Sequence, residues 1–145
     1  RKYFSITPEP VIDEDVYDIE HGFGYSIFKH TANNISGELT MFCPKDKKLK
    51  LCKVLLENKS LEGKGLTLFY YSSMVLGVYS YKSAKYISTN IEENFIYAQN
   101  PFNKYFYKNK TYLTILGGEA YGFREQLQDS MSLGILDSMV SLCDY

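Results

Sequence analysis

The chain has 145 residues, a length that fits one domain with a single sizeable core. Hydrophobic residues make up 45% of the sequence and charged residues 23%, which argues against a disordered or collagen-like chain. The 16 Lys and Arg residues nearly balance the 17 Asp and Glu residues, and the net charge of -1 gives no general attraction to nucleic acid or anionic lipid.

Aromatic residues account for 16% of the chain, as 14 Tyr and 9 Phe with no Trp. Aromatic residues are enriched in strands, so the composition predicts a mainly β fold. The first twenty residues, by contrast, hold six acids and two prolines, which predicts an extended loop whose acids, Asp13 among them, face water.

Segments of strand-like composition follow in chain order. Over residues 35–43, apolar Ile35, Leu39 and Met41 alternate with polar residues, which predicts a strand with one buried and one solvent face. The pair Asn33-Asn34 before it predicts a hairpin turn. The run 49–58 is apolar on both faces and predicts a strand buried between layers. Further strands are expected at 24–31, 66–81, 86–89, 95–99 and 104–107, and their spacing favours an antiparallel β-sandwich.

The composition changes near residue 115, so we expect a partial β-sandwich over residues 1–115 and a turn followed by a helix over residues 116–145. The pair Gly117-Gly118 allows a tight turn. After it, apolar residues recur near every fourth position and predict an amphipathic helix from Glu125 to Cys143. These residues are Leu127, Met131, Ile135, Met139 and Leu142.

Three cysteines at wide spacing suit reduced thiols in a cytoplasmic protein, although a pairing of Cys43 with Cys52 stays open. No targeting or membrane-spanning segment is visible in the sequence. Five lysines between residues 45 and 53 predict a solvated strand edge.

No metal or cofactor motif emerges. His21 and His30 are nine residues apart without ligands at zinc spacing, so we expect two strand-borne histidines satisfied by hydrogen bonds. The glycines of Gly22-Phe23-Gly24 lack the rest of a dinucleotide-binding loop and predict a bulge or turn.

The predicted helix begins with a cluster of polar side chains. Arg124 offers a fork of donors and Glu125 two acceptor oxygens, a combination that can hold adjacent hydroxyls of a sugar ring. Gln128 and Asp129 lie one turn further along and extend the set. A simple surface charge pair at a helix start is the alternative interpretation.

The stretch Tyr121-Gly122-Phe123-Arg124-Glu125-Gln126-Leu127-Gln128-Asp129 resembles the Tyr-Gly-Phe-Arg-Asp-Gln-Leu-Gln-Asp signature of inverting glycoside phosphorylases of glycoside hydrolase family 94, relatives of cellobiose and chitobiose phosphorylase. Within this family the chain is most similar to the branch of 1,2-β-oligoglucan phosphorylase and cyclic β-1,2-glucan synthase. Upstream motifs that resemble the N-terminal β-sandwich of that branch include Glu20-His21-Gly22-Phe23-Gly24, His30-Thr31-Ala32-Asn33 and Asn100-Pro101-Phe102-Asn103.

The resemblance implies that inorganic phosphate attacks the anomeric carbon of a β-linked glucan while an acid protonates the leaving oxygen, which yields α-glucose 1-phosphate. It also implies that Arg124 and Glu125 hold the sugar in the donor subsite and that residues 116–145 correspond to the start of an (α/α)₆ barrel. Glu125 departs from the family pattern, which has Asp. Only about a dozen residues separate Asn103 from Gly117, far fewer than the family has.

The resemblance therefore leads us to expect a truncated or internally deleted copy, inactive alone because no residue stands at the family's general-acid position. It would bind β-glucan oligosaccharides, need no cofactor besides phosphate as co-substrate, and self-associate or join the missing remainder of an enzyme. The alternative is a non-catalytic β-sandwich that serves as a carbohydrate-binding or structural module.

Overall fold

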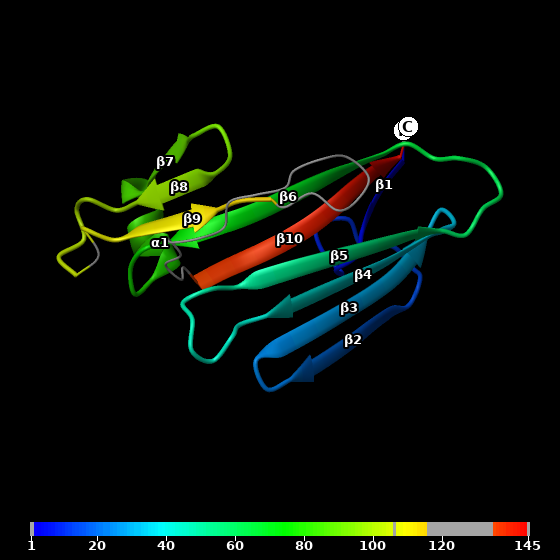
Figure 1. Cartoon of the computed structure of the whole chain (residues 1–145), viewed down its shortest axis with the longest axis horizontal. Helices are drawn as coiled ribbons and strands as arrows, with labels where there is room; N and C mark the ends of the chain where they lie inside the picture. Colours follow the sequence, from blue (N-terminus) through cyan, green and yellow to red (C-terminus); the bar gives the residue numbers. More distant parts are fainter. Residues whose placement is uncertain (1, 106, 116–134, 145) are drawn as a thin grey trace. The chain divides into compact units, whose positions relative to one another are not determined.

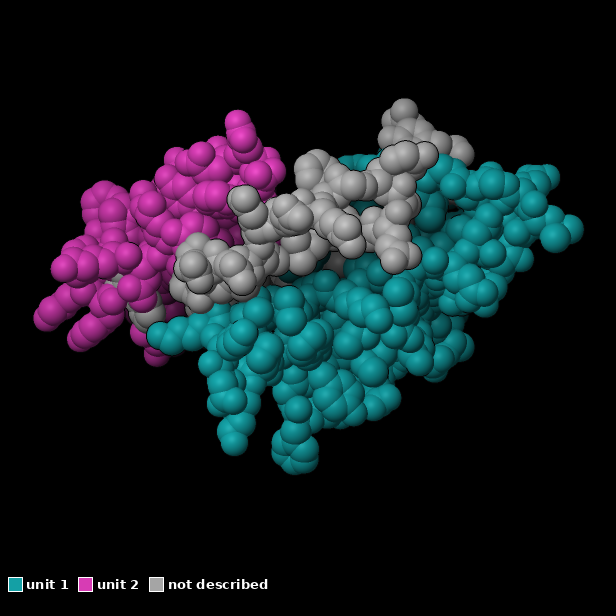
Figure 2. All heavy atoms as spheres, viewed as in Figure 1, with its two compact units in different colours: residues 1–72, 137–145 teal, residues 73–136 magenta. Residues whose placement is uncertain are grey.

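The computed structural model describes residues 2–105 and 107–115, together with the backbone of residues 135–144. Two compact units emerge: one comprises Arg1–Ser72 and Asp137–Tyr145, and the other comprises Ser73–Leu136 (Figure 2). The described residues are mainly β, and the strand pairs whose register is defined are all antiparallel, which confirms the predicted fold class. No helix among them is long and apolar enough to cross a membrane.

The first unit is built on a four-stranded meander. Its strands are β2 (Tyr17–Gly22), β3 (Tyr25–Ala32), β4 (Ile35–Phe42) and β5 (Leu51–Asn58), which pair in sequence order (Figure 1). Short turns join the first three strands, so each strand pairs with its neighbour along the chain. Such local pairing is the simplest antiparallel arrangement.

The register assigns each side chain to one of two faces. Because directly opposed residues share a face, the pairs Lys29↔Glu38 and Phe28↔Leu39 point to opposite sides of the sheet. One face carries Ile35, Leu39 and Met41, and the other carries Ser36, Glu38 and Thr40. This confirms the alternation predicted for residues 35–43.

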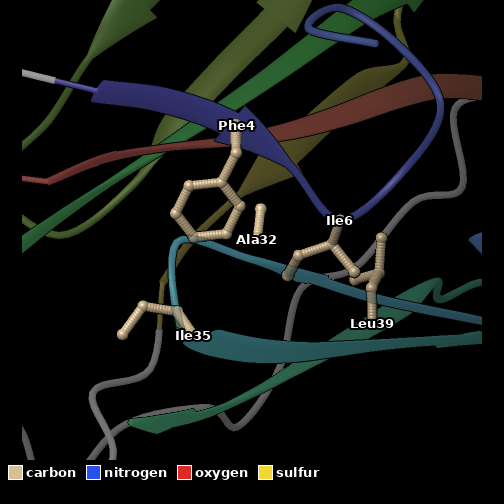
Figure 3. Close-up of a cluster of buried hydrophobic side chains, with 5 residues drawn as sticks. All are labelled: Phe4, Ile6, Ala32, Ile35 and Leu39. Carbon is tan, nitrogen blue, oxygen red and sulfur yellow. The ribbon is translucent and has the colours of Figure 1, made fainter. Parts of the chain in front are cut away.

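The apolar face is covered by the N-terminal segment. Phe4 and Ile6 point toward Ala32, Ile35 and Leu39, and these five side chains form the buried core of the first unit (Figure 3). All are 6% exposed or less. Fully burying an aliphatic or aromatic side chain contributes roughly 1.5–3 kcal/mol, so this cluster anchors the segment that precedes β2.

The two turns of the meander use different means to reverse the chain. Asn33 and Asn34 both have positive φ, 52° and 60°, which is the backbone that a two-residue hairpin turn needs. In the turn between β2 and β3, Gly24 supplies the positive φ of 81° and Phe23 is fully exposed at the tip. Both predicted turns are confirmed.

The position of β5 differs from the prediction. It lies at the edge of the meander and most of its side chains are intermediate or exposed, so it is not buried between layers. Leu55 and Leu56 are 48% and 39% exposed. Lys53 is exposed on this strand, which agrees with a lysine-bearing solvated edge.

The C-terminal helix prediction is wrong over Ile135–Cys143. Strand β10 (Ile135–Asp144) lies there between β1 (Lys2–Ser5) and β6 (Leu66–Val75), and it pairs with β1 from Lys2↔Asp144 to Ser5↔Ser141. A spacing of four residues is about one helical turn, but it is also two pleats of a strand, so the apolar pattern fits both structures. The rest of the predicted helix, Glu125 to Gly134, lies outside the described residues, and the expected division after residue 115 stays a prediction.

The second unit contains a small sheet and a helical turn. Helix α1 (Ser80–Ser83) and the 3₁₀ helix η1 (Ala84–Tyr86) follow β6, so the strand expected over residues 66–81 ends at Val75. Strands β7 (Ser88–Ile91), β8 (Ile96–Gln99) and β9 (Lys110–Leu113) pair in that order (Figure 1).

A buried asparagine organises the loop after β8. The side-chain amide of Asn100 donates to the carbonyl oxygen of Leu76 at 2.9 Å, and its side-chain oxygen accepts from the backbone N–H of Phe102 at 3.3 Å. Residues 104, 105 and 107 lie in turns, so these described residues do not form the strand predicted over residues 104–107. A buried amide with both its groups bonded holds a loop in one conformation.

Candidate functional site

The four residues predicted to hold sugar, Arg124, Glu125, Gln128 and Asp129, lie outside the described residues. Their role therefore stays a prediction. The described part of the chain offers a different polar cluster, which joins the N-terminal loop to β2 and β3.

His30 is the centre of this cluster. Its side chain is 0% exposed, its Nε2 lies 2.8 Å from Oδ2 of Asp13, and its Nδ1 lies 3.1 Å from the carbonyl oxygen of Val16. Both partners are acceptors, and a neutral imidazole has only one N–H to donate. The neutral ring donates to one of them and the protonated ring to both, so in either form His30 fastens residues 13–16 to β3.

Tyr17 completes the cluster from the neighbouring strand. It is the direct partner of His30 across β2 and β3, and the two rings stack with centroids 3.9 Å apart and an angle of 11° between their planes. The Tyr17 hydroxyl accepts from the backbone N–H of Asp13 at 3.3 Å and donates to the carbonyl oxygen of Val11 at 3.4 Å. Burial raises the pKa of Tyr17 above its ordinary value of 10.0, and the charge of Asp13 adds to the effect.

Asp13 is held in its ionised form. Partial burial on its own would raise the pKa of this carboxyl, but hydrogen bonds from His30 and from the backbone N–H of Asp15, together with the charge of His30, lower it below the ordinary 3.8. Asp13 faces water in part, with a side chain that is 33% exposed, but it also binds the buried ring of His30, which the sequence did not predict.

A hollow of about 440 Å³ adjoins His30 but lies mainly on the other face of the meander, because Asp18, Lys29, Thr31 and Ser36 alternate with Tyr17 and His30 along the strands. Its lining consists of Asp15, Val16, Asp18, Lys29, His30, Thr31 and Ser36. The carboxylates and hydroxyls accept hydrogen bonds and the hydroxyls also donate, a mixture that suits a neutral ligand with several hydroxyl groups. Lys29 is already paired with Glu38, 3.4 Å away.

The other histidine also has a partner. His21 lies on β2, and its Nδ1 is 2.9 Å from the hydroxyl of Ser26 on β3. The prediction of two strand-borne histidines satisfied by hydrogen bonds is thus confirmed. In the described ranges, no group of three or more His, Cys, Asp or Glu side chains could hold a metal ion. Cys43 and Cys52 are free thiols, so the alternative of a disulfide between them is not realised.

Sequence reasoning missed the link between Asp13 and His30. The two residues are 17 positions apart, and no local spacing indicates their pairing. His30 could be assigned to a strand from its neighbours, but the acid that it contacts depends on the path of the N-terminal loop. A second contact also holds this loop in place: the backbone N–H of Val11 donates to Oγ of Ser5 at 2.9 Å.

Comparison with known proteins identifies relatives of the chain. Residues 1–128 match the family model of the glycosyl hydrolase 94 supersandwich domain. The chain is 33% identical to the N,N'-diacetylchitobiose phosphorylase of Vibrio proteolyticus and 31% identical to that of Vibrio furnissii, each over 72 residues. These matches cover 48% of this chain but 9% of either relative, and no solved structure matches the chain significantly.

The family model extends over most of the sequence, including all of the meander and the small sheet of the second unit. Its description as a supersandwich agrees with the antiparallel strands that the structure shows. The chain therefore belongs to the supersandwich-domain family of glycosyl hydrolase 94 and is related to glycoside phosphorylases.

Proposed function

We propose that this chain forms the sandwich part of an inverting glycoside phosphorylase that acts on β-linked glucans. The family match over residues 1–128 is the observation that carries the proposal. In this reaction inorganic phosphate attacks the anomeric carbon, the glycosidic bond breaks, and an acid gives a proton to the leaving oxygen. The products are α-glucose 1-phosphate and a shortened glucan.

Four side chains of this sequence are proposed to bind the terminal sugar: Arg124, Glu125, Gln128 and Asp129. The guanidinium of Arg124 donates to sugar hydroxyls and the carboxylate of Glu125 accepts from them. The likeness of residues 121–129 to the 1,2-β-oligoglucan branch supports a β-1,2-linked glucan as the ligand. A chitobiose derivative, named by the curated relatives, is the competing sugar class.

The general acid is proposed to come from a longer or assembled polypeptide. The curated relatives are much longer than this chain, which spans 9% of their length in the matched region. Exposed Leu55 and Leu56 on the edge strand β5 support association with another copy or with the remainder of such an enzyme. The free thiols Cys43 and Cys52 support a cytoplasmic location.

A non-catalytic sugar-binding module is the second candidate. The hollow lined by Asp15, Asp18, Thr31 and Ser36 favours it, because these carboxylates and hydroxyls can hydrogen-bond the hydroxyls of a sugar. In this case the chain would bind glucans, and it would not catalyse their phosphorolysis even when joined to further domains.

Titration calorimetry with short β-1,2-linked gluco-oligosaccharides tests the proposal. Charged hydrogen bonds contribute about 1.5–3 kcal/mol each, so Arg124→Ala should weaken binding roughly tenfold or more. Glu125→Asp restores the family residue and should bind at least as well as the wild type, and exposed Lys47 provides the control Lys47→Ala. Equal heats for the wild type and Arg124→Ala would remove the proposed subsite. Phosphate-dependent release of glucose 1-phosphate by this chain alone would refute the need for a separate general acid.

A further inference from the structure

In the small sheet of the second unit, small side chains lie on the buried face and large aromatic side chains lie on the other face. Ala98 and Thr111 oppose each other across β8 and β9 and are 0% and 1% exposed, so this face is the buried one. Tyr97 and Tyr112 oppose each other one position along and therefore point to the other face. Tyr97 and Tyr112 are only partly buried, in contrast to Ala98 and Thr111, so their face of the sheet is the more accessible of the two.

The outer face gathers three aromatic rings. The ring of Phe95 lies 5.6 Å from that of Tyr112 and 6.4 Å from that of Tyr97, and the two tyrosine rings are 6.1 Å apart. Their planes are inclined at 41° to 64° to one another. Aromatic pairs in this range attract each other beyond their area burial, so the rings form one connected apolar patch.

Polar side chains surround this patch on the same face. Asn90 opposes Tyr97 across β7 and β8, and Gln99 opposes Lys110 across β8 and β9. Neither amide is buried. We call the set of Asn90, Phe95, Tyr97, Gln99, Lys110 and Tyr112 the ring face.

The charge of the ring face indicates which ligand it suits. The Nζ of Lys110 lies 4.2 Å from the ring centroid of Tyr97, so a cation already occupies the position that a ligand ammonium group would take. None of the six side chains is a carboxylate. A neutral ligand fits such a face better than a cationic one.

We propose that the ring face binds a β-linked glucan chain. A β-glucopyranose ring has C–H groups on its two faces and hydroxyls around its rim. The aromatic rings would contact the C–H face, while the amides of Asn90 and Gln99 and the ammonium of Lys110 hydrogen-bond the rim hydroxyls. The inference rests on the proposed function for its choice of ligand, but it assigns a surface separate in sequence from Arg124 and Glu125.

Such a surface would bind glucose units of the chain in addition to the terminal one. Binding would then strengthen with chain length, because a longer chain reaches more of the ring face and adds contacts without a second encounter. Short and long β-1,2-linked gluco-oligosaccharides should therefore differ in affinity.

The experiment compares the wild type with Tyr112→Ala and with Asn90→Ala by titration calorimetry against both oligosaccharides. Tyr81→Ala is the matched control, because Tyr81 is an exposed tyrosine of the same unit that is not part of the ring face. We expect Tyr112→Ala to weaken binding about tenfold, Asn90→Ala to weaken it several-fold, and Tyr81→Ala to bind as the wild type does. Asn90→Ala leaves the ring cluster unchanged, so it keeps the test decisive if Tyr112→Ala disturbs folding.

Three results would overturn the inference. The first is unchanged glucan affinity in Tyr112→Ala and Asn90→Ala. The second is a wild type that binds no glucan but whose mass by light scattering falls in Tyr112→Ala, since the face would then join two copies. The third is binding of a single-stranded oligonucleotide in place of glucan, with the salt dependence typical of phosphate contacts.

The Arg124→Ala variant keeps this inference separate from the proposed function. If Arg124→Ala abolishes binding and the ring-face variants do not, the donor subsite stands and the ring face is refuted. If the ring-face variants lose binding and Arg124→Ala does not, the ring face stands and the donor subsite is refuted.

Discussion

The carboxylate of Asp13 lies 2.8 Å from Nε2 of His30, and this contact fastens the N-terminal loop to the meander. The imidazole is fully buried, whereas the carboxylate is one-third exposed. The pair therefore couples the position of a surface loop to the interior of the sheet. Asp15 and Val16, which follow Asp13 along the chain, also line the polar hollow.

Asp13→Asn should destabilise the chain at neutral pH. The substitution keeps the size of the side chain but removes its charge. A hydrogen bond to a charged group contributes about 1.5–3 kcal/mol, and exposure of the carboxylate reduces this, so we expect a loss of about 1 kcal/mol in the free energy of unfolding. Urea denaturation measures it, with the exposed neighbour in Glu14→Gln as the control. Equal effects of the two substitutions would contradict a specific contact.

The stability that Asp13 supplies should depend on pH in the acidic range. Folding lowers the pKa of this carboxyl below 3.8, so the unfolded chain binds its proton first as the pH falls. The contribution is fully present above that ordinary value and disappears as the pH falls through the lower value of the folded chain. The difference in unfolding free energy between the wild type and Asp13→Asn should therefore shrink below about pH 4. A difference that grows there would reverse the assigned sign.

Gly37→Ala should destabilise the first unit by overpacking. A Cβ at Gly37 would lie 2.7 Å from Cγ1 of Ile6, closer than Cβ atoms come in proteins, and 3.0 Å from its Cδ1, which is tighter than most Cβ contacts. Inserting such a group into a packed core costs about 1–3 kcal/mol. The penalty should be smaller when Ile6→Ala is already present, which a double-mutant cycle measures. Gly63→Ala, where a Cβ would meet no atom within 4 Å, should be nearly neutral.

The hairpin between β3 and β4 should tolerate glycine at Asn34 but not a β-branched residue. Asn34 has a φ of 60°, a conformation that costs most L residues about 1–2 kcal/mol and glycine very little. Asn34→Gly should leave the thermal midpoint near that of the wild type, and Asn34→Val should lower it. Equal midpoints for both variants would show that the turn relaxes to another conformation.

Cys43 should react with a thiol reagent before Cys52. Cys43 is exposed, whereas burial raises the pKa of the Cys52 thiol above 9.0, and the thiolate is the reactive form. Labelling rates at neutral pH can be compared in a Cys143→Ser background, with Cys43→Ser and Cys52→Ser added one at a time. Removal of Cys43 should abolish the fast phase, and removal of Cys52 should leave it intact.

The meander could be predicted from sequence because its signals are local. Alternation over residues 35–43 depends on neighbours two positions apart, and the turn at Asn33-Asn34 depends on two residues. The same local pattern failed at the C-terminus, where a four-residue spacing fitted a helix and a strand equally well. The C-terminal segment forms a strand because β1, at the other end of the chain, supplies its hydrogen-bond partners.

The candidate site shows the same limit. His30 and its strand were predicted, but Asp13 was not, because the contact depends on how a 17-residue segment folds back. The ring face was also hidden: aromatic residues at 95, 97 and 112 are consistent with core positions until the register shows that Ala98 and Thr111 take the buried side.

The pairing of β1 with β10 has a consequence for the order of folding. Lys2 meets Asp144 only after almost the whole chain has closed into a loop, whereas β2 to β5 pair across short connections. Loop closure costs more entropy as the loop grows, so the meander should form early and the strand pair from the two ends should form last. Amide hydrogens of the β1–β10 ladder should then exchange with solvent through partial opening, while those shared by β3 and β4 wait for complete unfolding.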